Sequence, residues 1–255
     1  MATALITGGT SGIGAAFARA LAGRGDDLVL VARNADRLTE MAAELTERYG
    51  VRVETISADL GSREDTLRVA DRLASPDSPV DTLINNAGFG VPVRLLAEDT
   101  TPHEHAFDVM IRAVLILAAA AGRNMRTRGT GTIINVSSTA GFVTMGSYSA
   151  IKAWVTTYSE GLANELAGSG VQVTALCPGW VRTEFHERAD ITTSTIPAPL
   201  WLQADDLVAA CLADAARGTI ISIPSKRYKV LITLARLAPR GVVRAASRKL
   251  SSSRH

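Results

Sequence analysis

The sequence predicts an α/β fold in which helices cover both faces of one parallel β-sheet. Through residue 225, short apolar segments typical of buried strands alternate with longer segments of helical periodicity. The first apolar segment runs directly into a glycine-rich turn and then into a helical pattern. The composition is 47% apolar over 255 residues, which suffices for one substantial core. No internal repeat divides this region, so we expect one domain over residues 1–225 and a distinct extension over residues 226–255.

The elements of this domain follow one another in strand–helix order. Strands are predicted at residues 2–7, 27–32, 52–57, 80–84, 131–136, 171–177 and 219–223. Helices are predicted from the glycine turn to residue 21 and at residues 35–49, 63–73, 103–128, 147–166 and 205–217. Residues 184–203 show no clear period.

The glycine-rich turn has the sequence context of a dinucleotide-binding site. It reads Gly8-Gly9-Thr10-Ser11-Gly12-Ile13-Gly14 and joins the first predicted strand to the first helix. Glycines let the backbone turn tightly against a pyrophosphate, which then lies at the positive N-terminus of the helix. We therefore predict a doubly wound, parallel-sheet Rossmann fold. The predicted phosphate-binding residues are Gly8, Thr10, Ser11, Gly12, Ile13 and Gly14.

The end of the second predicted strand bears on the choice of cofactor. An acidic residue there would bond the ribose 2′-hydroxyl of NAD(H), but this chain has Ala32-Arg33. A guanidinium at that place suits a 2′-phosphate, so we expect NADP(H) rather than NAD(H). Arg33 could instead be an ordinary solvated loop residue. Asp59, at the end of the third strand, could bond the adenine, cap the next helix, or do both.

Other features of the sequence exclude some classes of protein. Residues 1–7 lack the basic start of a signal peptide, and no uninterrupted apolar run is long enough to cross a membrane. Cys177 and Cys211 lie in apolar segments and are expected to be reduced core residues of a cytoplasmic protein. His103 and His105 have no third ligand nearby, so we expect no metal site. Nothing in the sequence indicates a nucleic-acid partner.

Tyr148 and Lys152 form a candidate acid/base pair. They are four residues apart at the start of a predicted helix, so both side chains project from one face. A free phenol titrates near pH ~10, and a neighbouring ammonium group favours the phenolate and lowers that pKa. The pair is therefore predicted to exchange a proton with a substrate. The same spacing also occurs on ordinary surface helices.

Taken together, these motifs resemble those of the short-chain dehydrogenase/reductase family. The matching segments occur in the family's order and cover about the first 225 residues. They are Thr7-Gly8-x-x-x-Gly12-Ile13-Gly14, Asn85-Asn86-Ala87-Gly88, Ser138, Tyr148-x-x-x-Lys152 and Pro178-Gly179.

The resemblance implies a role for each matching residue. Tyr148 would be the general acid in carbonyl reduction, Lys152 would hold the nicotinamide ribose, and Ser138 would bond the substrate oxygen. Thr183 would bond the carboxamide. The cofactor-binding residues implied in addition to the glycine turn are Arg33, Asp59, Leu60, Asn86, Ala87, Gly88, Tyr148, Lys152, Pro178, Gly179, Val181 and Thr183.

The chain departs from the family pattern at two points. Met110 stands where the family usually has an asparagine that helps to hold a water connecting the lysine to solvent, and a thioether is a poor substitute. The loop between Ser138 and Tyr148 is also shorter than usual, so Ser137 could face the substrate in place of Ser138. An alternative function is therefore a catalytically impaired NADP(H)-binding or sensing protein.

The predicted substrate is hydrophobic, because the side chains expected near the pocket lean apolar. The loop 184–203 and residues 89–96 are expected to line that pocket. The side chains concerned are Phe89, Phe142, Met145, Trp180, Phe185 and Trp201. A small carbonyl or alcohol compound is thus the expected partner, and we expect the chain to form a homodimer or homotetramer.

The extension over residues 226–255 is strongly basic. It holds nine of the 27 Lys and Arg residues and no acid, which leaves the preceding 225 residues with 18 basic against 25 acidic groups. A helix there would place an apolar stripe beside a basic one, broken or kinked at Pro239. Such a segment could lie on a membrane surface, which would make the protein membrane-associated, or pack on the body or on a second subunit.

Overall fold

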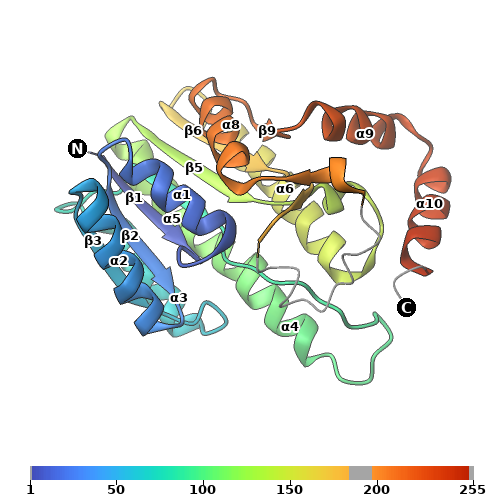
Figure 1. The fold of residues 1–255 in the computed structure, drawn as a ribbon, viewed down its shortest axis with the longest axis horizontal. Helices are drawn as coiled ribbons and strands as arrows, with labels where there is room; N and C mark the ends of the chain where they lie inside the picture. Colours follow the sequence, from blue (N-terminus) through green and yellow to red (C-terminus); the bar gives the residue numbers. More distant parts are fainter. Residues whose placement is uncertain (1, 184–196, 253–255) are drawn as a thin grey trace.

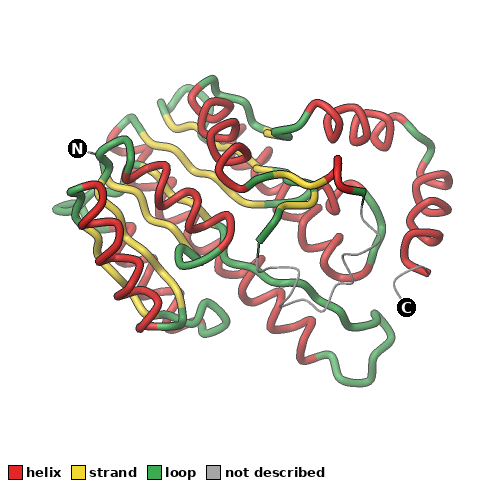
Figure 2. The backbone as a smooth tube through the Cα atoms, viewed as in Figure 1, coloured by secondary structure: helices red, strands yellow, loops and turns green. Residues whose placement is uncertain are grey.

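The fold is a seven-stranded parallel sheet between two layers of helices (Figures 1 and 2). The computed structural model describes residues 2–183 and 197–252. The strand order is β3-β2-β1-β4-β5-β6-β9. The strands are β1 Thr3–Thr7, β2 Asp27–Ala32, β3 Val53–Ser57, β4 Thr82–Asn85, β5 Gly131–Val136, β6 Val171–Leu176 and β9 Ile221–Ser222. The predicted doubly wound fold is therefore confirmed.

The strand order reverses at β1, which pairs with β2 on one side and with β4 on the other. In sheets of this kind, ligands bind beyond the carboxyl ends of the strands at the reversal point. The turns after β1 and β4 carry the glycine-rich motif and the Asn-Asn-Ala-Gly motif. The topology thus brings two distant motifs to one edge of the sheet.

Two layers of helices bury the two faces of the sheet. Consecutive strand residues alternate between them: Leu5 packs in one core and Ile6 in the other. One layer contains α1 Gly12–Ala22, α2 Ala35–Tyr49 and α8 Ala204–Ala216. The other contains α3 Arg63–Ala74, α5 Ala113–Arg128 and α6 Gly146–Glu165. Cys211 is a free thiol buried in the core of the first of these layers, and Cys177 is a free thiol buried in a third, smaller cluster.

The helix predicted at residues 103–128 contains an irregular turn. It begins as α4 Thr101–Phe107, passes through a single π-helical turn at Asp108–Arg112, and continues as α5. By length and composition it is the one described helix that could cross a membrane, but more than half of its most apolar stretch is buried inside the protein. It is therefore placed as a core helix of the fold.

The aperiodic stretch before α8 contains short elements that the sequence did not predict. A short 3-10 turn, Ala198–Leu200, precedes β8 Trp201–Leu202, which pairs with β7 Trp180–Val181. Residues 184–196, including Phe185, lie outside the described part of the chain. Most of the predicted pocket loop therefore remains a prediction.

The basic extension forms two helices, α9 Lys226–Leu237 and α10 Arg240–Ser252. The chain turns between them (Figure 1), and Pro239 lies at this break, as its ring predicts. Tyr228 and Ile232 of α9 are buried against Cys177 and Ile223 of the body. One face of α9 is thus part of the packed interior.

Candidate active site

A cavity of about 2210 Å³ opens at the carboxyl edge of the sheet. It is lined by the turns that follow β1, β2, β3, β4, β5 and β6, by the start of α6 and by one face of α9. The predicted motifs, from the glycine turn to Pro178-Gly179, therefore meet in one cavity. Asp59 is the only carboxylate among its described lining residues.

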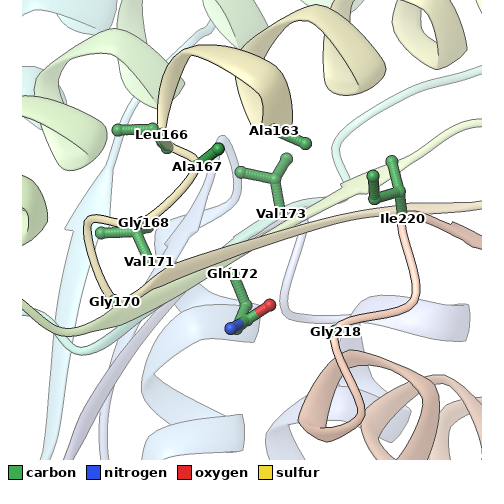
Figure 3. Close-up of a pocket in the computed structure, with 10 residues that line it drawn as sticks. All are labelled: Ala163, Leu166, Ala167, Gly168, Gly170, Val171, Gln172, Val173, Gly218 and Ile220. Carbon is green, nitrogen blue, oxygen red and sulfur yellow. The ribbon is translucent and has the colours of Figure 1, made fainter.

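A second, smaller cavity of about 280 Å³ lies at the other end of β6 (Figure 3). Figure 3 shows the aliphatic side chains and glycines that line it, with Gln172 as the one polar side chain. None of its described lining residues has a side chain that could transfer a proton. The large cavity is therefore the candidate active site.

The glycine turn forms a close backbone cradle. Gly8 and Gly12 have φ values of 65° and 54°, in the region that favours glycine. A Cβ atom at Gly14 would lie 2.1 Å from the Gly8 carbonyl oxygen and 2.5 Å from Asn86 Nδ2. A side chain at position 14 would therefore push α1 away from the turn that follows β1. Thr10, Ser11 and Ile13 line the cavity beside the N-terminus of α1, where the backbone N–H groups suit a phosphate.

Thr7 holds the two cofactor-side turns together, a role that the sequence analysis did not assign. Its buried Oγ1 accepts hydrogen bonds from the backbone N–H groups of Asn86 (2.9 Å) and Ala87 (3.0 Å) and donates to the Ile84 carbonyl (3.3 Å). Asn86 Nδ2 in turn donates to the carbonyl oxygens of Thr7 (2.9 Å) and Gly8 (3.2 Å). The position of Thr7, a hydroxyl residue directly before Gly8, was the sequence signal that could have predicted this role.

Two arginines line the corner of the cavity after β2. Arg33 is exposed there, and its carbonyl accepts a hydrogen bond from Ser57 Oγ at 3.2 Å. Arg37, in the first turn of α2, lines the same corner. The Asn34 side chain caps that helix by accepting from the Arg37 backbone N–H (2.9 Å). The sequence analysis did not assign Arg37 to the cofactor site. The presence of a second arginine four residues after Arg33 could have indicated it.

Asp59 lines the cavity, but it does not cap the following helix. Its Oδ1 accepts from the Gly61 N–H (2.9 Å), whereas Ser62 caps α3 by accepting from the Asp65 N–H (3.3 Å). The capping alternative for Asp59 is therefore wrong, because the helix begins at Arg63 with Ser62 as its cap. Leu60 is buried at the cavity wall.

Ser138, Tyr148 and Lys152 meet at the end of β5. Ser138 is hydrogen-bonded to the Tyr148 phenol. Lys152 is only 5% exposed, and its Nζ donates to the Val136 carbonyl at 2.8 Å and lies 5.6 Å from the centre of the Tyr148 ring. The three side chains thus form one compact polar group on the cavity wall.

The pKa values of this group differ from the sequence prediction. Burial raises the pKa of Tyr148 to about 12, against the smaller lowering effect of the Ser138 hydrogen bond. Burial lowers the pKa of Lys152 to about 8. The predicted lowering of the Tyr148 pKa by Lys152 is therefore wrong for this structure. The lysine amine is itself desolvated and donates to the Val136 carbonyl, so burial dominates the pKa of Tyr148.

Ser137 and Ser138 point to different surroundings. Ser137 is buried, donates from Oγ to the Lys152 carbonyl (2.7 Å), and lies 2.8 Å from Thr156 Oγ1. Its hydroxyl therefore faces α6, and Ser138 is the serine beside Tyr148. The short loop is a 3-10 turn in which a Cβ at Gly141 would lie 2.8 Å from the Lys152 backbone. The loop therefore packs directly on α6.

Met110 lies in the π turn, 1% exposed, near the group formed by Ser138, Tyr148 and Lys152. A Cβ at Gly88 would lie 3.0 Å from the Met110 sulfur and 3.7 Å from Lys152 Nζ. The thioether thus occupies the space behind Gly88 and close to the lysine. Single π turns are frequent at functional sites.

The Pro178-Gly179 wall is built with help from α9. A Cβ at Gly179 would lie 2.0 Å from the Tyr228 ring, so the ring lies directly against that glycine. The Tyr228 hydroxyl donates to the Leu200 carbonyl (2.9 Å) and accepts from the Trp180 N–H (3.1 Å). On the cofactor side, Val181 is buried and Thr183 lies over Gly12.

The expected apolar lining is present in part. Phe89, Met145 and Trp180 line the cavity. Phe142 does not, because its ring lies under the Arg236 guanidinium, 5.9 Å away. Trp201 packs instead against Trp180, with ring centres 6.1 Å apart. The lining that the sequence analysis missed comes from α9: Leu231, Ile232 and Ala235.

His103 and His105, for which no metal site is predicted, contact different groups. His103 Nε2 lies 3.1 Å from the Arg94 carbonyl oxygen, and the His105 ring stacks on Phe89 with centres 5.2 Å apart. Among the described residues, no three side chains of the types that bind metals converge on one point.

Comparison with known proteins agrees with this geometry. A family model described as short chain dehydrogenase matches residues 2–193. A short-chain dehydrogenase from Sphingobium yanoikuyae, solved in complex with NADPH, is 38% identical, with a TM-score of 0.84 over 92% of this chain and 94% of that one. A bulky-bulky ketone specific alcohol dehydrogenase from Comamonas testosteroni is 33% identical, with a TM-score of 0.80 over 92% of each chain.

A third relative extends the similarity along most of the chain. The 2-dehydro-3-deoxy-D-gluconate 5-dehydrogenase of Bacillus subtilis is 32% identical over 239 residues, which cover 87% of this chain and 92% of the relative. All three relatives are named as dehydrogenases, and the two names that specify a substrate specify different ones. This chain is an NAD(P)-dependent oxidoreductase and belongs to the short-chain dehydrogenase/reductase family.

Proposed function

We propose that the protein reduces a bulky, apolar carbonyl compound to the alcohol with NADPH, and catalyses the reverse oxidation. The observation that carries this proposal is the hydrogen-bonded Ser138–Tyr148 pair above Lys152, in the same cavity as the glycine cradle. A proton donor for the substrate and a turn suited to the cofactor's pyrophosphate thus line one cavity.

The cavity residues fit NADP(H). The glycine cradle leaves room for a pyrophosphate at the N-terminus of α1, and Arg33 and Arg37 suit a 2′-phosphate at the end of β2. The relative solved in complex with NADPH supports this choice. When bound, the cofactor supplies the hydride, and the chemistry of that transfer belongs to the nicotinamide.

The chain's own residues supply the proton and hold the carbonyl. Tyr148, with a pKa of about 12, is protonated at neutral pH and so is in the form that donates to the substrate oxygen. Ser138 is placed to bond the same oxygen and to stabilise charge that develops there. Lys152, whose pKa is about 8, can return a proton toward Tyr148. In the oxidation direction Tyr148 accepts the proton only as the phenolate, so its raised pKa favours reduction at neutral pH.

The apolar character of the cavity supports a hydrophobic substrate. Phe89, Met145, Trp180, Leu231 and Ile232 all line it. One relative's name specifies bulky-bulky ketones, which is consistent with a cavity of this size. The alternative of a sensing protein without turnover has no support from the relatives, which are named as enzymes.

The test is a panel of ketones mixed with NADPH and followed by the loss of nicotinamide absorbance. We expect turnover of aryl-alkyl and long-alkyl ketones, and a loss of about 10²–10⁴-fold in Tyr148→Phe, which keeps the ring but has no proton to donate. NADPH binding, followed by fluorescence, should be unchanged in that variant. Native-like turnover by Tyr148→Phe would overturn the mechanism.

A further inference from the structure

Exposed apolar side chains gather at the mouth of the cavity. Leu95 and Leu96, in the loop between β4 and α4, are 66% and 96% exposed and also line the cavity. Leu231 of α9 does the same. A side chain that both lines a cavity and faces solvent lies at its rim. The rim therefore carries exposed leucines from two segments far apart in the sequence, both on the right-hand side of Figure 1. The exposed Arg94 lies beside Leu95, and the exposed Glu98 and Asp99 follow on the same loop.

Helix α9 carries a second apolar stripe that faces away from the body. Tyr228 and Ile232 are buried in the fold, whereas Val230, Leu234 and Leu237, at spacings of four and three residues, are exposed. Leu237 is 79% exposed. A helix that packs on a protein needs one apolar face, so the second stripe requires another explanation.

The charges around this stripe all have one sign. Residues 226–255 contain no acid, and none of the ion pairs that the structure describes involves α9 or α10. The exposed basic residues of the two helices are Lys226, Arg227, Lys229, Arg236, Arg240, Arg244 and Arg248. An apolar stripe flanked by cations matches an interface of acyl chains and anionic headgroups.

We propose that α9, α10 and the Leu95–Leu96 rim dock on an anionic lipid surface, so that the cavity opens toward the bilayer and receives an apolar carbonyl substrate from it. The choice of substrate rests on the proposed function. A lipid surface contacts both rim segments at once without a complementary shape. It also neutralises the cations of both helices, which an apolar protein face would leave unpaired.

The binding test uses the full chain and sedimentation with vesicles. In ~0.1 M salt, we expect the native protein to sediment with equimolar phosphatidylglycerol and phosphatidylcholine, and to remain largely in the supernatant with phosphatidylcholine alone. Arg240→Gln with Arg244→Gln should weaken binding about thirtyfold, near fivefold for each charge. Leu234→Gln with Leu237→Gln should weaken it by tenfold or more.

Two controls keep this result specific. Leu67→Gln replaces an exposed leucine on α3 and should bind vesicles as the native protein does. All variants should reduce a small soluble ketone at the native rate, since Leu234, Leu237, Arg240 and Arg244 do not line the cavity. With a long-alkyl ketone dissolved in the anionic vesicles, the native protein should turn over several times faster than the leucine variant.

Three outcomes would overturn the docking proposal while leaving the proposed function intact. One is a native protein that reduces soluble ketones but stays in the supernatant with anionic vesicles. Another is a loss of vesicle binding in Leu67→Gln that equals the loss in Leu234→Gln with Leu237→Gln. The third is a native dimer that Leu234→Gln with Leu237→Gln converts to a monomer, which would show that a second copy covers the stripe. Failure to reduce any soluble ketone would instead count against the proposed function.

Discussion

At the scale of single residues, burial sets the protonation of Tyr148 and Lys152, the proposed catalytic pair. Tyr148 and Lys152 both lose water, and each is pushed toward its neutral form: the phenol to a pKa of about 12 and the amine to about 8. A protonated phenol and a lysine that titrates near neutrality suit carbonyl reduction. Spacing in the sequence predicts that the two groups share a helix face, but it carries no information about how much water each retains.

The buried lysine has a cost in stability that can be measured. Below pH 8 Lys152 is charged in both the folded and the unfolded chain, and the folded chain bears the full penalty of burying that charge. Between about pH 8 and 10.5 only the unfolded chain stays protonated, so this group makes stability rise with pH. We expect Lys152→Met to raise the free energy of unfolding at pH 7 by roughly 1–3 kcal/mol and to abolish turnover.

Urea unfolding at pH 7 and pH 9.5 checks this prediction. The advantage of Lys152→Met should shrink at pH 9.5, where the native lysine is largely neutral in the folded chain. Lys152→Gln, which keeps a donor for the Val136 carbonyl, serves as the matched variant. A variant less stable than the native protein at pH 7, with an unaltered pH slope, would contradict the argument.

Cofactor preference is a second property of individual residues. Arg33→Ala should lower the preference for NADPH over NADH about tenfold or more, because a charge-assisted bond to the 2′-phosphate contributes about 1.5–3 kcal/mol. Arg37→Ala should lower it by a smaller factor, and Arg24→Ala, which lies outside the cavity, should not change it. Titration calorimetry with both cofactors gives the ratio. Equal affinity of the native protein for NADPH and NADH would contradict the assignment.

At the scale of elements, the π turn at Asp108–Arg112 places Met110 against Gly88 and close to Lys152. Met110→Asn should raise turnover or shift its pH profile without altering NADPH affinity, because an amide can hold a water that a thioether cannot. Met110→Leu should keep the native profile. Stopped-flow measurement of the turnover rate from pH 6 to 10 compares the two variants with the native protein. If Met110→Asn has the native rate and profile, water reaches Lys152 by another route.

Regular elements were predictable and irregular ones were not. The strands and helices of the sheet layers lie within a few residues of their predicted positions, because apolar periodicity and glycine turns are local signals. The π turn and the pairing of β7 with β8 depend on contacts between distant segments. The same holds for the site: Ser138, Tyr148 and the glycine cradle follow from motifs, whereas Thr7, Arg37 and the α9 lining follow from packing.

At the scale of the whole molecule, α9 is both a wall of the cavity and a cover for the body. Ending the chain after Ser225 would expose the apolar surface of Cys177 and Ile223. We expect that truncated protein to aggregate or to melt at a clearly lower temperature, and to lose turnover. Leu237→Gln, on the outer stripe, should remain soluble with the native melting temperature. A soluble truncated protein that melts with the native one would show that α9 contributes little to the fold.

The contact between Tyr228 and Gly179 also bears on biosynthesis. Strands β1 to β6 leave the ribosome well before α9, and domains generally begin to fold from the N-terminal side during synthesis. The nascent sheet can therefore form its phosphate cradle while the Tyr228 ring, which completes the opposite wall, is still being translated or has just emerged. The cavity wall is complete only once α9 has been synthesised, and until then the apolar patch of Cys177 and Ile223 that α9 later covers remains exposed.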